Sequence, residues 1–139
     1  MRRTVIQQLA ALPLAVGSAS ALAKGDRRID KRLLGTWKSD QERTTKLWKY
    51  KNELDEVKKA KFESIFGKMT RRFTPAMVYS EFEGQKLSGR YWVVASDIRS
   101  VVVAYPDQSG IELQQIFFEE DWHYVFSGYN VEFFRRVGA

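Results

Sequence analysis

The sequence predicts a mainly β domain: an antiparallel up-and-down meander of about eight strands that closes into a barrel, with one amphipathic α-helix inserted between strands 1 and 2. Runs of β-branched and aromatic residues recur at short spacing, and turn residues separate them. Connections this short favour antiparallel neighbours, because a parallel pair needs a crossover of a dozen or more residues. Closure of the meander would leave no unpaired strand edge.

The first expected strand precedes the helix, and Pro75, Gly84 and the loop 106–110 separate several of the later ones. The expected strands cover residues 33–37, 68–74, 77–83, 89–96, 100–105, 111–119, 122–126 and 131–137.

The helix is expected over residues 44–66, where apolar side chains recur at helical spacing. Ser39 and Glu42 have the spacing of a capping box, and Gly67 is well placed to end the helix. The predicted stripe consists of Leu47, Tyr50, Leu54, Val57 and Ile65.

Residues 1–23 have the three parts of a secretory signal: a charged start, a short apolar stretch and small residues ending at Ala23. We expect cleavage there, which leaves a single domain over 24–139 in the periplasm or outside a bacterial cell. The segment from Arg2 to Gln7 resembles a twin-arginine signal, with Val5 and Ile6 where that motif usually has Phe and Leu. An ordinary Sec signal is the alternative. No later stretch is long and apolar enough to predict a transmembrane segment.

The charge pattern argues against a nucleic-acid partner. The chain has 23 basic and 17 acidic residues, net +6. Residues 24–72 contribute 16 basic and 8 acidic residues, whereas residues 73–139 contribute 5 and 9. The basic excess is mixed with acids along the helix, not interleaved with aromatics on a sheet face as nucleic-acid binding requires. Without cysteine and with one histidine, no metal site and no cofactor are expected.

No catalytic residues are expected, and we predict that the protein is not an enzyme. His123 lies two positions after Asp121 on a strand, yet no nucleophile motif accompanies it. Glu81 and Glu83 share a strand face but read as outward-facing polar residues. The acidic run 119–121 lacks the alternating ligand spacing of a Ca²⁺ loop.

The segment Leu33-Leu34-Gly35-Thr36-Trp37, followed by a basic residue on the last strand, resembles the lipocalin-like (calycin) barrels. This resemblance implies that Trp37 closes the barrel floor and that a last-strand arginine, Arg135 or Arg136, packs across it. The inserted helix resembles the lid of fatty-acid-binding barrels. Typical lipocalins are longer and carry their main helix near the C-terminus, so the chain looks more like the small bacterial lipocalin-like proteins than a classical transporter.

A barrel of this kind is filled by side chains or holds one small ligand. If Glu112, Gln114 and Glu132 face water, the inward residues form an apolar pocket with four polar members. That pocket suits a hydrophobic or amphiphilic ligand with a carboxylate. The expected ligand residues are Tyr91, Gln115, Tyr124 and Arg135, and Gly35, Trp37 and Arg136 form the expected structural motif.

The alternative is a filled barrel that binds a protein or an envelope component through its outer face or its basic helix. In either case we expect a monomer.

Overall fold

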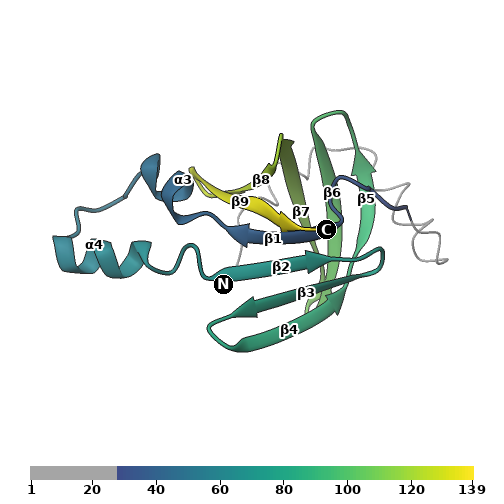
Figure 1. The fold of residues 1–139 in the computed structure, drawn as a ribbon, viewed down its shortest axis with the longest axis horizontal. Helices are drawn as coiled ribbons and strands as arrows, with labels where there is room; N and C mark the ends of the chain where they lie inside the picture. The colour runs from purple at the N-terminus through teal and green to yellow at the C-terminus, as the bar shows by residue number, and fades with distance from the viewer. Residues whose placement is uncertain (1–27) are drawn as a thin grey trace.

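The computed structural model describes residues 28–139, and the predicted signal segment lies outside them. These residues form a mainly β, nearly closed antiparallel barrel of nine strands (Figure 1). The strand order is β4-β3-β2-β1-β9-β8-β7-β6-β5. The strands are β1 (Gly35–Ser39), β2 (Met69–Phe73), β3 (Met77–Phe82), β4 (Gln85–Arg90), β5 (Trp92–Ser96), β6 (Ser100–Asp107), β7 (Gly110–Glu119), β8 (Trp122–Ser127) and β9 (Asn130–Gly138).

The predicted fold class is confirmed, and the structure adds one strand. Residues 85–90 form β4, which pairs with β3 from Gln85 to Arg90 and ends where Tyr91 leads into β5. The expected strand 89–96 is therefore divided at Tyr91. Although consecutive in sequence, β4 and β5 are the two edges of the sheet, and the barrel stays open between them.

The helical insertion between β1 and β2 is present, but as two short helices, α3 (Gln41–Lys46) and α4 (Glu56–Glu63). The Asn130 side chain bonds both the amide and the carbonyl of Lys49, at 2.6 and 3.0 Å, and so holds the intervening backbone outside a helix. Asp55 then caps α4 by accepting from Lys58.

The predicted capping box at Ser39 and Glu42 is wrong. Asp40 caps α3 by accepting from the amide of Arg43, while the Ser39 hydroxyl accepts from the amide of Gly67. Gly67 has φ +89°, in the left-handed region that favours glycine, and follows the last helical turn.

Gly35, Trp37 and Arg136 pack together where β1 pairs with β9. Trp37 is fully buried and donates its indole N–H to the Leu33 carbonyl at 2.9 Å. The Arg136 guanidinium lies 4.3 Å from the Trp37 ring centroid and donates to the carbonyls of Leu34 and Arg32. Gly35 has φ +121°, and a Cβ there would lie 2.6 Å from Arg136 Nη1. A side chain at position 35 therefore conflicts with the arginine.

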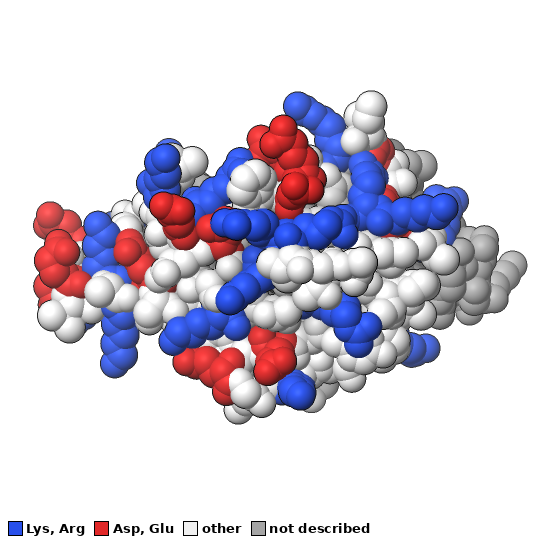
Figure 2. All heavy atoms as spheres, in the orientation of Figure 1, with Lys and Arg blue, Asp and Glu red and all other residues white. Residues whose placement is uncertain are grey.

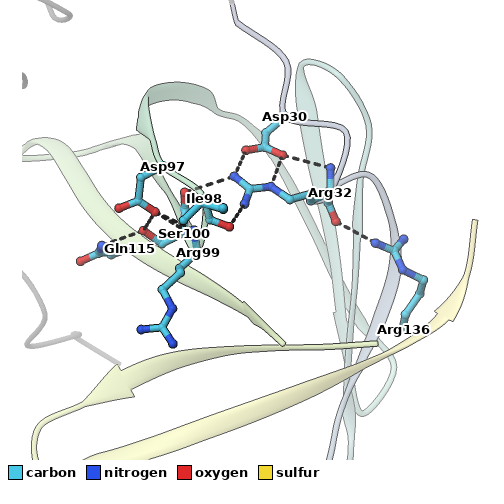
Figure 3. A network of polar contacts seen from close by, with 8 residues as sticks. All are labelled: Asp30, Arg32, Asp97, Ile98, Arg99, Ser100, Gln115 and Arg136. Atoms are coloured by element: carbon cyan, nitrogen blue, oxygen red, sulfur yellow. Dashed lines mark hydrogen bonds and ion pairs between the residues drawn. The ribbon is translucent and has the colours of Figure 1, made fainter. Parts of the chain in front are cut away.

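A network of polar contacts joins the segment before β1 to a neighbouring turn and to β9 (Figure 3). Arg32 forms an ion pair with Asp30 at 2.7 Å and donates to the carbonyls of Ile98 and Ser100. Asp97 accepts from Ser100 in the same turn. The segment before β1 is thereby joined to the β5–β6 turn and, through Arg136, to β9.

Basic side chains cross the outer face of β1, β2 and β9 (Figure 2), where Lys38, Arg72 and Arg135 are exposed. At the α4 end, Lys and acidic side chains are mixed, as expected from the sequence. Within residues 28–139, no helix is long and apolar enough to cross a membrane.

Candidate functional site

The strand register determines which side chains face the barrel interior, and it reverses the expected assignment on β7 and β9. Ile116 and Phe134 belong to the main core, so Gln114 and Glu132, two positions away on the same strands, also face inward. Both are more than nine-tenths buried. The prediction that Gln114 and Glu132 face water is wrong, and so is the same prediction for Glu112, which shares the inner face of β7 with Gln114 and lines an interior cavity. A shift of one residue moves every side chain of a strand to the other face.

Of the four predicted ligand residues, only Tyr91 lies inside. Its hydroxyl donates to the Thr74 carbonyl at 2.6 Å, and burial raises the pKa of Tyr91 to about 12. The outward Gln115 donates to the Ser100 hydroxyl at 2.9 Å.

The other two lie on the outer face as well. Tyr124 stacks on Phe117 with ring centroids 5.2 Å apart, on the face opposite the buried His123 and Val125. Arg135 is largely exposed and pairs with Asp40 at 3.4 Å. The four predicted residues therefore do not line one cavity, and Arg136, not Arg135, covers Trp37.

A cavity of about 370 Å³ opens between the inner faces of β2–β4 and β6–β7. Its wall combines apolar side chains with one arginine, one glutamate and several neutral polar groups. The lining residues are Met69, Arg71, Val78, Ser80, Leu87, Ser88, Gly89, Tyr105, Glu112 and Gln114. We call this space the barrel cavity.

Arg71 is the buried charge of the barrel cavity. It is 8% exposed, and its Nη2 donates to the Tyr105 hydroxyl at 2.9 Å, which in turn donates to Gln114 Oε1 at 2.9 Å. Its guanidinium also lies 4.9 Å from the Phe73 ring centroid. Among residues 28–139, no carboxylate lies within 4.0 Å of it.

The sequence carries the signal for this inward arginine. Met69, Arg71 and Phe73 alternate with Thr70 and Arg72, so the side of β2 that bears the apolar residues also bears Arg71. The predicted ligand arginine, Arg135, lies on the outer face of the last strand, so Arg71 takes the place in the interior that was expected for it.

A second cavity of about 470 Å³ lies where the helical segment meets the barrel, and we call it the helix cavity. Trp48, Phe62 and Phe66 form one side, with ring centroids 5.0–5.6 Å apart. Its lining residues are Trp48, Phe62, Ile65, Phe66, Met69, Phe82, Ser127 and Glu132. Met69 lines both cavities.

His123 is fully buried against aromatic rings, and neither ring nitrogen has a hydrogen-bond partner within residues 28–139. Its ring centroid is 4.3 Å from that of Trp37 and 4.9 Å from that of Phe134. Burial, with the nearby charges of Arg71 and Arg136, holds the pKa of His123 well below its usual value. The imidazole is therefore neutral, and among the described residues no group forms a hydrogen bond through which it could exchange a proton.

The acidic candidates lie apart from His123. Glu81 is exposed on the outer face of β3, where it lies opposite Thr70. Glu83 forms a surface ion pair with Lys68 at 3.1 Å, and Glu119 pairs with Arg43. Within the part of the chain that the structure describes, no group of three acidic or histidine side chains is placed to hold a metal ion.

Comparison with known proteins finds no matching family model, no matching curated protein and no matching solved structure. The site therefore has to be interpreted from its own chemistry.

Proposed function

We propose that the protein binds one small hydrophobic or amphiphilic molecule in its barrel and does not catalyse a reaction. The observation that carries this proposal is the barrel cavity, whose volume and mixed lining are those of a small-molecule site. The neighbouring helix cavity adds an aromatic surface that a ligand can cover.

The lipocalin-like resemblance supports the same proposal, because Arg136 packs on the Trp37 ring beside Gly35, as that resemblance implies. Partner binding by a filled barrel is less well supported, because the interior retains open volume beside Met69 and Gly89.

Replacing Gly89 by phenylalanine should strongly weaken binding by filling the barrel cavity. Gly89 lies opposite the inward Val78, and a Cβ there meets no atom within 4 Å, so the ring enters open space. The purified chain is titrated with N-phenyl-1-naphthylamine, an uncharged fluorescent probe of apolar sites. We expect saturable binding to the wild type and a loss of at least about tenfold in the variant, or about 1.4 kcal/mol.

Lys86→Phe is the matched control, because Lys86 is exposed on the same strand. It should bind the probe as the wild type does. A wild-type chain that fails to saturate with probe, or a Gly89→Phe variant that binds normally, would contradict the proposal.

Export is the second part of the proposal, with residues 1–23 as the signal and the periplasm or the exterior as destination. N-terminal sequencing of protein recovered from the periplasm and the medium tests it. A chain that retains residues 1–23 in the cytoplasm would overturn it.

A further inference from the structure

We propose that Arg71 binds the carboxylate of a singly charged amphiphile, whose apolar chain extends past Met69 into the helix cavity. This inference rests on the proposed function and names the ligand class and its orientation in the site.

Arg71 forms no ion pair with a carboxylate among residues 28–139. A guanidinium that is more than nine-tenths buried loses most of its hydration, and this costs free energy unless an anion or several acceptors replace the water. Within residues 28–139, Arg71 has one hydrogen-bond acceptor, the neutral Tyr105 hydroxyl. Its Nε and Nη1 donors remain for a ligand, and a carboxylate can accept from such a fork through two oxygens.

The lining of the barrel cavity contains one charged side chain of each sign, Arg71 and Glu112, and the two do not form an ion pair with each other. A ligand with one negative charge can pair with Arg71, and Glu112 repels it less than it would repel a doubly charged phosphate. A monocarboxylate therefore fits better than a phosphate ester.

The different linings of the two cavities indicate how the ligand is oriented. The helix cavity is lined mostly by apolar and aromatic side chains, and its acidic residue is the buried Glu132. A carboxylate is disfavoured among these apolar side chains, whereas an alkyl chain gains free energy with each CH₂ that it buries there. Because Met69 lines both cavities, a chain that starts at Arg71 reaches the helix cavity past this flexible side chain.

The test compares decanoate with decanol, which have the same chain length and differ in the charge of the head group. Each displaces N-phenyl-1-naphthylamine from the full chain at pH 8. We expect decanoate to bind the wild type at least about tenfold more tightly than decanol. Arg71→Met should remove this preference by weakening decanoate at least about tenfold while changing decanol little.

Arg72→Met is the matched control, because Arg72 is the next residue and points outward over Tyr79. It should keep the preference. Arg71→Lys retains the charge without the fork and should bind decanoate between the wild type and Arg71→Met, which provides a second variant if methionine disturbs folding.

The outcomes separate the two proposals. If the probe binds but the wild type does not prefer decanoate, the assignment of Arg71 is overturned and the proposed function stands. If Arg71→Met weakens both ligands equally, Arg71 has a structural role only, and the assignment is again overturned. If the probe itself does not bind, both proposals fail.

Discussion

Trp37→Ala should lower the free energy of unfolding by about 4 kcal/mol, the range found when a buried tryptophan or phenylalanine is truncated. The substitution empties a site that is 0% exposed and removes the surface on which Arg136 and His123 pack. It also leaves the buried Leu33 carbonyl without the indole N–H that it accepts. Urea unfolding followed by far-ultraviolet circular dichroism measures the change.

Tyr129→Ala is the control for Trp37→Ala. Tyr129 is 85% exposed in the β8–β9 turn, so its removal should change stability by less than about 0.5 kcal/mol. If Trp37→Ala lowers the free energy of unfolding no more than Tyr129→Ala does, the stability of the core around Trp37 does not depend on the indole.

The free energy of unfolding should fall as the pH drops below about 6.5. The contribution of His123 to this fall is about 1.4 kcal/mol per pH unit. In the folded state its pKa lies well below 6.5, so the imidazole stays neutral among aromatic rings and near two arginines. The unfolded chain takes up a proton near pH 6.5, so the unfolded state binds more protons below that pH. The stability that depends on a neutral His123 is therefore fully present above pH 6.5 and is lost progressively as the pH falls below it.

Because His123 is the one histidine in the sequence, His123→Leu isolates its contribution. The variant should have a nearly flat stability between pH 7 and 4.5. It should also be more stable than the wild type by about 1–3 kcal/mol, since two unpartnered buried nitrogens are removed. Urea unfolding of both proteins across this range measures the slope, and a wild-type slope equal to that of the variant would contradict the assignment.

The fold class could be read from the sequence because the strand pattern is strong and the turns are short. The additional strand β4 could not, since Gln85–Arg90 is a mostly polar, exposed edge whose pairing with β3 gives no apolar signal. The division of the helix depends on Asn130, about eighty residues away in sequence, which no local pattern reveals.

The candidate site was harder to predict because both faces of β7 and β9 carry apolar side chains. Phe133 and Phe134 are both buried, so the position of the charged residues was the remaining indication of the inner face. Glu132 and Gln114 gave the wrong indication, because in this barrel buried polar residues line the interior. An assignment from apolar neighbours, as on β2, identifies Arg71.

The position of β9 between β1 and β8 has a consequence for the order in which the chain folds. Seven of the eight pairings join strands that are consecutive along the chain. Six of these have short connections, and the seventh, β1–β2, spans only the helical insertion, so all seven form from local segments. The remaining pairing, β1 with β9, must bring together the two ends of the described chain at a larger entropic cost. During synthesis, β1 therefore remains without its second neighbour, and Trp37 without Arg136, until β9 has been made.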